Sequence, residues 1–307
     1  MSTGTGTVPS SEMAEASSVE VGGRTIEVSH PDKVMFPGDG ITKGDLVDYY
    51  ARIADVMVPH VRDRPLTQQQ FPGGLRGGGF WRKQVADHFP PWIGRVTVDT
   101  HEGPQRQLLA NDPAALPYIA NQNCITPHVW TARADKLTHP DQVIFDLDPE
   151  GDDDFPAVKS GARTLRGILE DLGLTAYVKT TGSKGLHVVA PIKRTADYER
   201  VLVFAHAAGQ RLIEEDPDHF TPEFRKERRS GRIFVDVLRN RYAQTAVPPY
   251  AVRARAGAPV ATPLEWEELR SLRNARKYTL RNLFRRLGRR GDPWADMTRK
   301  ARALPRI

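Results

Sequence analysis

The stretch Val143-Ile144-Phe145-Asp146-Leu147-Asp148-Pro149 places two carboxylates two residues apart inside an apolar run. Successive side chains of a β-strand point to opposite faces, so residues i and i+2 share a face. The pattern predicts a buried strand that carries Asp146 and Asp148 on one face and ends at Pro149. Buried carboxylates need compensation, which a divalent cation with a preference for oxygen ligands supplies. An Asp-Pro turn would explain Asp148 but would leave Asp146 inside a strand.

A second apolar run, Ile233 to Leu238, is interrupted by one acid, Asp236. A single buried aspartate is more often a hydrogen-bonded structural residue than a metal ligand. Three acids on two such strands indicate one site, because three carboxylates can hold a pair of divalent ions. Sites of this kind clamp the attacking and leaving oxygens in phosphoryl transfer.

The string Thr180-Thr181-Gly182-Ser183-Lys184-Gly185-Leu186-His187 has the composition of a phosphate-binding turn. Its glycines allow the backbone to approach a phosphate, and its hydroxyl groups and Lys184 supply donors. The Walker spacing GxxxxGK[ST] is absent. Taken alone, the string is better explained as a turn that joins two strands.

The composition is that of an ordinary soluble protein, with 39% hydrophobic and 27% charged residues among 307. The single cysteine, Cys124, excludes an intramolecular disulfide and a zinc site built on several cysteines. We find no membrane span and no signal peptide, and therefore expect a cytoplasmic protein. The net charge of +6 indicates a polyanionic partner. The basic runs at 225–229 and 273–290 fit phosphate contacts and solvated helix faces equally well.

We expect residues 1–18 to form a disordered tail and residues 19–307 to form one domain. The pattern predicts a hairpin over 19–28 and a helix that starts after Thr42 and ends at Pro59. Further expected elements are a glycine-rich loop over 71–79, strands near 125–130, 176–180, 186–190 and 232–238, helices near 113–121, 155–172 and 196–214, and a helical section from 262. This irregular alternation favours an α+β fold with mixed sheets over a doubly wound parallel sheet.

The glycine-rich loop leads into Phe80-Trp81-Arg82-Lys83, which sets two aromatic side chains beside two cations. The aromatic residues could anchor the loop in the core. Alternatively, they could stack on bases while Arg82 and Lys83 contact phosphate. The residues themselves do not decide between these interpretations.

Together, Asp146-Leu147-Asp148, the string from Thr181 to His187 and the strand with Asp236 resemble the motifs of the archaeo-eukaryotic primase superfamily. The closest resemblance is to the polymerase domain of bacterial non-homologous end-joining ligase D and to related stand-alone primase-polymerases. It extends from about Val28 to Met297. It implies a primase-like catalytic core, with mixed β-sheets flanked by helices around a central cleft.

The resemblance also assigns roles to individual residues. It implies that Asp146, Asp148 and Asp236 are the catalytic, metal-binding acids. The residues implied at the nucleotide are His128, Thr181, Ser183, Lys184, His187, Arg229 and Arg253. The residues implied at DNA are Lys33, Lys43, Phe80, Trp81, Arg82 and Lys83, of which the first two match lysines that hold a downstream 5′-phosphate.

The implied activity is metal-dependent, DNA-directed addition of NTPs or dNTPs to a primer 3′-hydroxyl at gaps or DNA ends during repair. The resemblance implies two divalent metal ions, with Mn²⁺ preferred and Mg²⁺ as the alternative. The expected partners are DNA with a 5′-phosphate and the nucleotide, with a DNA ligase and Ku as further candidates, and we expect a nucleoid-associated monomer. A non-catalytic module that recognises DNA ends or gaps is the main alternative, and a metal-dependent nuclease is a third.

The chain departs from the family pattern at three places, one of which is the glycine-rich loop before Phe80, whose composition indicates unusual flexibility. Gln68-Gln69-Gln70 stands where basic residues usually follow Arg-Pro-Leu-Thr, and His30 stands where asparagine is common. The differences put the substrate contacts near these positions in doubt and suggest a specialised paralogue.

Overall fold

The computed structural model describes residues 17–100, 103–152 and 154–306. The helices are α1 (Lys43–Val61), α2 (Ala115–Asn121), α3 (Phe155–Asp171), α4 (Tyr198–Glu215) and α5 (Leu283–Arg290). The strands are β1 (Ser17–Val21), β2 (Arg24–Val28), β3 (Val34–Phe36), β4 (Ile41–Thr42), β5 (Leu66–Gln70), β6 (Phe80–Arg82), β7 (Gly94–Thr100), β8 (Gly103–Leu109), β9 (Cys124–Val129), β10 (Gln142–Asp148), β11 (Tyr177–Thr180), β12 (Leu186–Pro191), β13 (Phe220–Thr221), β14 (Ile233–Asp236) and β15 (Pro263–Leu264).

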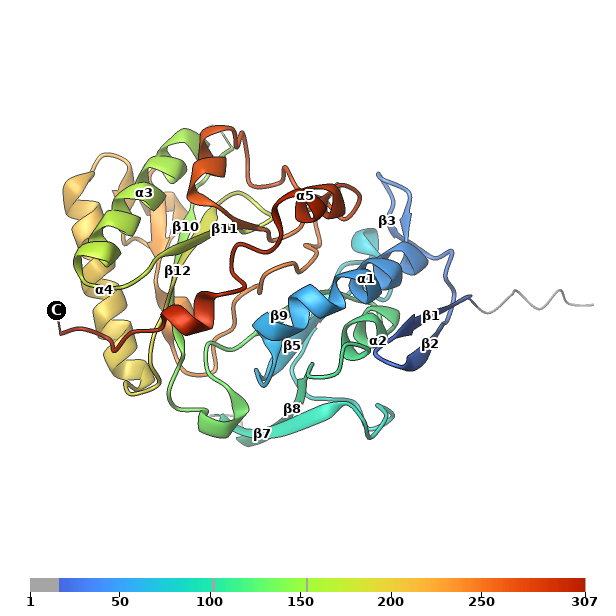
Figure 1. The fold of residues 1–307 in the computed structure, drawn as a ribbon. Helices are drawn as coiled ribbons and strands as arrows, with labels where there is room; N and C mark the ends of the chain where they lie inside the picture. The colour runs from blue at the N-terminus through green and yellow to red at the C-terminus, as the bar shows by residue number, and fades with distance from the viewer. Residues whose placement is uncertain (1–16, 101–102, 153, 307) are drawn as a thin grey trace, which may run out of the picture.

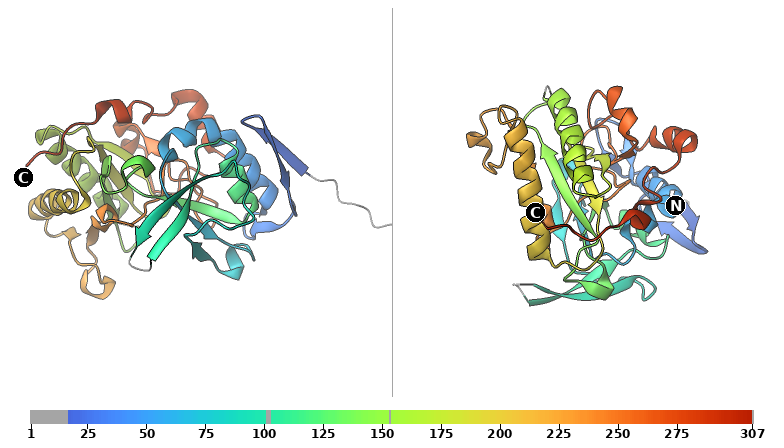
Figure 2. Two further views of the ribbon diagram at one scale, coloured as in Figure 1. Left: turned by 90° about the horizontal axis from the view of Figure 1, so that it is seen from below. Right: turned by 60° about the vertical axis from the view of Figure 1, so that its left-hand side comes forward.

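One half of the molecule is built on a six-stranded sheet with the order β13-β14-β10-β12-β11-β15. Most neighbours in this sheet are antiparallel, but β13 and β14 are parallel, so the sheet is mixed. Helices α3 and α4 lie side by side over one face (Figures 1 and 2). Val143, Phe145 and Leu147 of β10 pack into the core beneath these helices. The alternating residues Asp146 and Asp148 therefore point to the opposite face.

The other half is built on β5 to β9. Strand β5 pairs with β9 along one edge and with β6 and β8 along the other, and β7 pairs with β8 in a long hairpin (Figure 2). Helices α1 and α2 pack against this half, and their buried residues belong to a second hydrophobic core. The two cores leave the acidic face of the six-stranded sheet directed toward the strands of this half.

The predicted start of α1 is confirmed, because Thr42 and Asp45 form a capping box in which each side chain accepts from the other residue's backbone N–H. The predicted end was wrong, because the helix continues through Pro59 to Val61. Proline removes one backbone donor near the end of the helix. Met57, Val58 and Val61 are buried in the core, and their burial holds the last turn in place.

The α+β class, the mixed sheets and the hairpin around Gly22-Gly23 are confirmed. Residues 1–16 of the predicted tail lie outside the described residues. Ser17 and Ser18 pair with Val28 and Glu27 in β1, so strand structure starts before the predicted boundary at residue 19. The section from residue 262 begins with the short strand β15 rather than with a helix.

Candidate active site

Three carboxylates meet at the ends of two neighbouring strands. Asp146 lies directly opposite Asp236 in the antiparallel register of β10 and β14, and Asp148 lies opposite Phe234. Asp236 is 4% exposed, whereas the side chain of Asp148 is 44% exposed. The strand pairing thus brings together the three acids that the sequence placed on two separate strands.

The acids line a cleft of about 660 Å³ between the two halves, as the predicted central cleft requires. One wall consists of Thr67, Trp81, Gln105, Gln107 and His128, which come from the strands of the N-terminal half. The nucleotide residues inferred from the sequence resemblance, His128, Thr181, Ser183, Lys184, His187, Arg229 and Arg253, all line this cleft. Of the inferred DNA residues, Trp81 and Lys83 line it, whereas Lys33, Lys43, Phe80 and Arg82 do not.

Each carboxylate faces a basic side chain. His187 Nε2 lies 3.4 Å from an oxygen of Asp146. Arg229 Nη1 lies 3.3 Å from Asp148 Oδ2, and Arg239 Nη2 lies 3.1 Å from Asp236 Oδ2. Each acid is therefore held in place by an interaction with one basic side chain.

The electrostatics of the three acids differ. Burial favours the neutral form of Asp146, but the nearby basic side chains, His187 foremost, outweigh burial and lower its pKa to about 2. Burial and the negative charge of Asp146 raise the pKa of Asp148 and also that of Asp236. The acids therefore repel one another, and a shared cation would relieve the repulsion.

The donor set fits Mg²⁺ or Mn²⁺, because these ions prefer carboxylate oxygens. Within the described residues, no three His, Cys, Asp or Glu side chains are already gathered around one point. Asp148 and Asp236 instead pair with Arg229 and Arg239. Asp146, Asp148 and Asp236 are the residues that would hold the metal.

The turn between β11 and β12 packs against the end of β10. Thr181 organises it, because its hydroxyl accepts from the backbone N–H groups of Ser183 and Gly185 and donates to the Gly185 carbonyl. A Cβ on Gly185 would lie 1.9 Å from the carbonyl oxygen of Leu147, so only glycine allows this approach. Lys184 Nζ donates to the Glu150 carbonyl in the segment after β10. The turn is thereby fastened beside Asp148.

Two arginines border the turn and the acids. Arg253 Nη1 donates to the Thr181 carbonyl at 2.6 Å, and its buried Nε finds no hydrogen-bond partner in the described part of the chain. Burial is the main cause that lowers the pKa of Arg253 to about 10. Arg229 is 3% exposed and lies over the ring of Phe234. Both cations are fixed in position on the wall of the cleft.

The aromatic residues at the end of the glycine-rich loop are exposed, Phe80 at 44% and Trp81 at 51%. These values exclude the interpretation in which they anchor the loop in the core. Trp81 meets His128 edge to face with ring centroids 4.7 Å apart. Burial keeps the pKa of His128 well below its usual value, and none of the described residues forms a hydrogen bond with its buried Nε2. Trp81 and His128 thus offer an aromatic surface and an open imidazole nitrogen to the cleft.

Lys33 and Lys43 form a separate site outside the cleft. Lys43 Nζ donates to Ser29 Oγ at 2.8 Å, and Lys33 Nζ donates to Asn123 Oδ1 at 2.9 Å. Burial and the nearby charge of Lys33 lower the pKa of Lys43. Two ammonium groups thus lie close together on polar supports, a pairing that favours an anion between them.

A protein-family model described as the LigD primase-polymerase domain matches residues 42–294. The chain belongs to this family. It is 34% identical over 273 residues to the multifunctional non-homologous end joining protein LigD of Pseudomonas aeruginosa, covering 88% of this chain and 32% of that protein. A LigD of Mycobacterium tuberculosis is 34% identical over 252 residues, covering 80% of this chain and 33% of its own length. The chain thus spans about a third of these relatives.

The structural comparison supports the same assignment. The polymerase domain of Mycobacterium tuberculosis ligase D, solved in complex with DNA, superposes with a TM-score of 0.84 and 32% sequence identity, covering 90% of this chain and 99% of that one. As a LigD primase-polymerase domain, the chain is a polymerase-type nucleotidyltransferase of a metal-dependent family. No helix in the described part of the chain is long and apolar enough to span a membrane.

Sequence reasoning missed two residues that the structure sets beside the candidate ones, Lys179 and Asn123. Lys179 lies opposite His187, which lies opposite Asp146, so Asp236, Asp146, His187 and Lys179 form a row across four strands. Lys179 is 2% exposed, and its Nζ has no hydrogen-bond partner among the described residues. Its position one residue before Thr180, on a predicted strand, was the available signal. Asn123, which supports Lys33, carried no such signal because it lies in a turn.

Proposed function

We propose that this chain extends a primer 3′-hydroxyl with NTPs or dNTPs at DNA gaps or ends that bear a 5′-phosphate. The observation that carries the proposal is the cluster of three carboxylates in a cleft whose other walls carry the cations Lys184, Arg229 and Arg253. Carboxylates alone would repel nucleic acid, and cations alone would serve binding only. Their combination suits a reaction that joins a hydroxyl to a triphosphate.

In this reaction the primer 3′-oxygen forms a bond to the α-phosphorus, the bond to the β-phosphate breaks, pyrophosphate leaves and the hydroxyl proton passes to solvent. Two divalent ions, with Mn²⁺ preferred and Mg²⁺ as the alternative, would lower the pKa of the hydroxyl and neutralise the phosphates. Asp146, Asp148 and Asp236 would hold them. Lys184 and Arg253, which line the cleft, would balance the triphosphate charge as it moves toward pyrophosphate.

The cleft walls suggest roles in positioning the substrates. Trp81 offers an exposed aromatic face on which a base can stack. His128 Nε2 is buried and unpartnered, and a sugar hydroxyl would complete its hydrogen bonding. Outside the cleft, Lys33 and Lys43 would hold the downstream 5′-phosphate. We further propose a monomeric, cytoplasmic, nucleoid-associated enzyme that cooperates with a DNA ligase and with Ku.

A non-catalytic module that recognises DNA ends would need only the pair Lys33 and Lys43 outside the cleft. It would leave the three acids of the cleft without a role, and their mutual repulsion would be a cost without benefit. A nuclease would use the acids but would have less use for a wall of cations placed to receive a triphosphate. The polymerase proposal accounts for both groups of residues.

Purified protein should be offered gapped, nicked, overhanging and unprimed DNAs with Mn²⁺ or Mg²⁺ and with NTPs or dNTPs. We expect incorporation at the 5′-phosphorylated gap or end, and we expect the double variant Asp146→Ala, Asp148→Ala to lose it while it still binds DNA. Incorporation by that double variant, or none by the wild type on any substrate, would refute the polymerase proposal.

A separate experiment tests the proposed 5′-phosphate site at Lys33 and Lys43. The double variant Lys33→Gln, Lys43→Gln should bind a 5′-phosphorylated gap about tenfold or more weakly and should no longer discriminate it from a 5′-hydroxyl gap. Arg163→Gln, Arg211→Gln removes the same charge from exposed positions of α3 and α4 and serves as the matched control. Equal losses in both double variants would show that only the total charge matters.

A further inference from the structure

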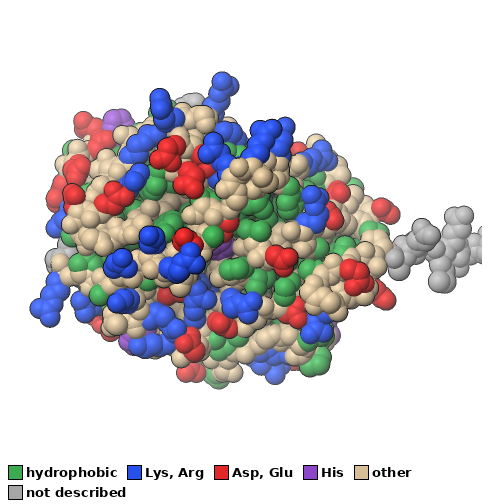
Figure 3. Space-filling model, in the orientation of Figure 1, with side chains coloured by type: hydrophobic (Ala, Val, Ile, Leu, Met, Phe, Trp, Pro, Cys, Tyr) green, Lys and Arg blue, Asp and Glu red, His purple; other side chains and the backbone are tan. Residues whose placement is uncertain are grey.

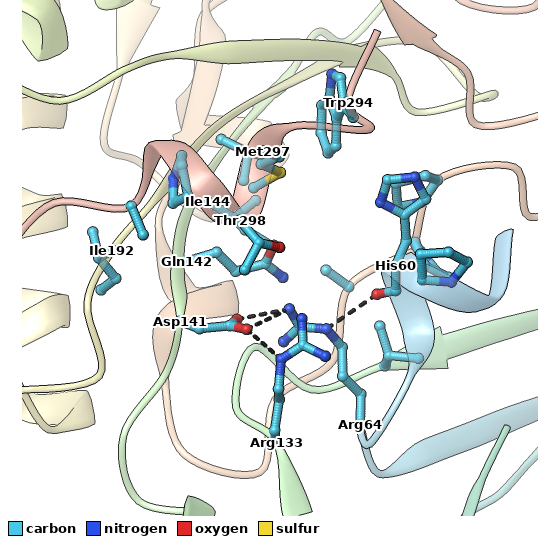
Figure 4. A pocket seen from close by; sticks show the side chains of 18 of the residues that line it. His60, Arg64, Arg133, Asp141, Gln142, Ile144, Ile192, Trp294, Met297 and Thr298 are labelled. Atoms are coloured by element: carbon cyan, nitrogen blue, oxygen red, sulfur yellow. Dashed lines mark hydrogen bonds and ion pairs between the residues drawn. The ribbon is translucent and has the colours of Figure 1, made fainter. Parts of the chain in front are cut away.

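A second cavity is lined by Lys179, which stands at the opposite end of the four-strand row from Asp236. Its volume is about 330 Å³, and it is enclosed by the end of α1, by β10, β11 and β12, and by the C-terminal segment around Trp294 and Met297 (Figure 4). Cavities of this size hold small molecules. It shares Ala246 and Val247 with the cleft but includes none of the three acids.

One side of the cavity is apolar. Ile144, Val189, Ala246, Trp294 and Met297 form a hydrophobic cluster of their own, separate from the two main cores, and all of them line the cavity. Such a small cluster buries little area by itself and leaves room that a ligand could fill. The buried indole Nε1 of Trp294 has no hydrogen-bond acceptor within the residues that the structure describes. This side suits an aromatic or branched aliphatic body.

The opposite side is cationic. In Figure 4, Arg64, Arg133 and Asp141 lie together across the cavity from Trp294. Asp141 pairs with Arg64 Nη2 and with Arg133 Nε, both at 2.7 Å. Two guanidinium groups thus share one carboxylate, and the group keeps a net charge of +1. The side chain of Arg64 is only 5% exposed, so much of this charge is shielded from water.

Donors remain open around this group. Arg133 uses Nε for Asp141 and Nη1 for the Arg62 carbonyl, and within the described residues its Nη2 makes no hydrogen bond. Lys193 lines the cavity mouth and has no ion pair among the described side chains. Figure 3 shows Lys and Arg side chains spread over the face of the molecule that it draws, interspersed with apolar ones. An anionic group would complete the hydrogen bonding of this side.

We propose that this cavity is an effector site for a small amphipathic monoanion, an aromatic or branched aliphatic body that carries one carboxylate or sulfonate. The body lies against Trp294 and Met297, and the anionic group meets Arg133. A nucleoside triphosphate is a poor fit, because the volume is half that of the cleft and one side is apolar.

The effector role follows from the shared strands and rests on the proposed polymerase function. Ile144 and Asp146 are neighbours on one face of β10, and Val189 and His187 are neighbours on one face of β12. Lys179 belongs to the acidic row and also lines the cavity. A bound anion therefore contacts the strands that position the acids, and its own charge acts on Lys179.

The binding test uses naphthalene-2-sulfonate as the probe and calorimetry as the readout. We expect the wild type to bind it, and we expect the uncharged naphthalene-2-sulfonamide to bind about tenfold or more weakly. Met297→Trp should abolish binding by filling the apolar side. Arg133→Gln leaves Arg64 and Asp141 as a balanced pair and should weaken binding about tenfold. Arg211→Gln, on the exposed face of α4, is the control and should bind like the wild type.

Melting temperature and binding to 5′-phosphorylated gapped DNA verify that each variant is folded. Absence of probe binding to the folded wild type would overturn the site, as would equal binding by Met297→Trp or by the neutral analogue. The effector role is tested by incorporation with and without saturating probe, which should change at least about twofold in the wild type and not in Met297→Trp. Binding without that change would overturn the effector role alone, and loss of incorporation in every sample would instead count against the polymerase proposal.

Discussion

Asp146 and Asp236 lie directly opposite each other on antiparallel strands, and the charge of Asp146 is one cause of the raised pKa of Asp236. Strands β10 and β14 thus place two carboxylates side by side, where their negative charges repel each other. Burial of apolar surface does not account for acidic residues at these positions. Such an arrangement stores repulsion that a bound cation releases. The pairing makes the site sensitive to small changes in either carboxylate.

Asp146→Asn should keep the shape of the side chain and remove its charge. We expect nucleotide incorporation to fall by about 100-fold or more, because a metal ligand is lost, while 5′-phosphate-dependent DNA binding is unchanged. Single-nucleotide incorporation under saturating Mn²⁺ measures the effect. Asp171→Asn, at the exposed end of α3, is the matched control and should leave the rate unchanged.

Lys179→Met should stabilise the protein by about 1–4 kcal/mol at pH 7. The reason is that an apolar side chain of similar length replaces a buried ammonium that has no hydrogen-bond partner among the described residues. The same change should slow nucleotide incorporation. Burial lowers the pKa of Lys179 to about 7, whereas the unfolded chain keeps the proton up to about pH 10.5. Between these values the unfolded state binds more protons, so the stability of the wild type rises with pH.

The advantage of the Lys179→Met variant should therefore shrink as the pH rises from about 7 to about 10. Urea unfolding at pH 7, 8.5 and 10 measures this trend. Lys300→Met changes an exposed lysine and should shift stability by less than about 0.5 kcal/mol at each pH. A constant or growing advantage would show that the ammonium of Lys179 is stabilised in the folded protein.

Gly185→Ala should destabilise the protein by about 1–3 kcal/mol and reduce incorporation, because its Cβ would collide with the Leu147 carbonyl beside Asp148. Gly167→Ala is the opposite case, since a Cβ at that position in α3 meets nothing within 4 Å. It should stabilise the helix by about 0.5–1 kcal/mol without a change in rate. Thermal unfolding and incorporation rates distinguish the two variants.

The buried pair between Glu268 and Arg286 ties α5 to the segment after β15. The Glu268 carboxylate accepts hydrogen bonds from Nε and Nη2 of Arg286. Burial opposes the charged form, but the hydrogen bonds from Arg286 outweigh it and lower the pKa of Glu268. The unfolded state therefore binds more protons in the acid range, so this contribution is full above about pH 4.5 and is lost as the pH falls through the lowered pKa.

Glu268→Gln should cost about 3 kcal/mol at pH 7, since it leaves Arg286 without its charge partner. The loss of stability between pH 5 and pH 3 should be smaller in the variant than in the wild type. Glu267→Gln, its exposed neighbour, should change neither quantity. Denaturant unfolding over this pH range tests the pair, and parallel curves for Glu268→Gln and the wild type would contradict its role.

Local chemistry in the sequence determined much of this protein. The alternation of apolar and acidic residues identified the strands of Asp146 and Asp236, and the capping residues identified the start of α1. The resemblance to primase-polymerases assigned the turn at Thr181 to the nucleotide, and it assigned Lys33 and Lys43 to DNA. These features are readable because strand alternation and capping act between residues close in sequence.

Only the tertiary structure decided how the strands pair and what faces the acids. It set Asp146 against Asp236, gave Asp148 and Asp236 arginine partners, and buried Lys179 in the same row without a partner. It also exposed Trp81, extended α1 through Pro59 and enclosed the cavity beside Trp294. These outcomes depend on contacts between residues far apart in the chain, where packing and electrostatics override local preference.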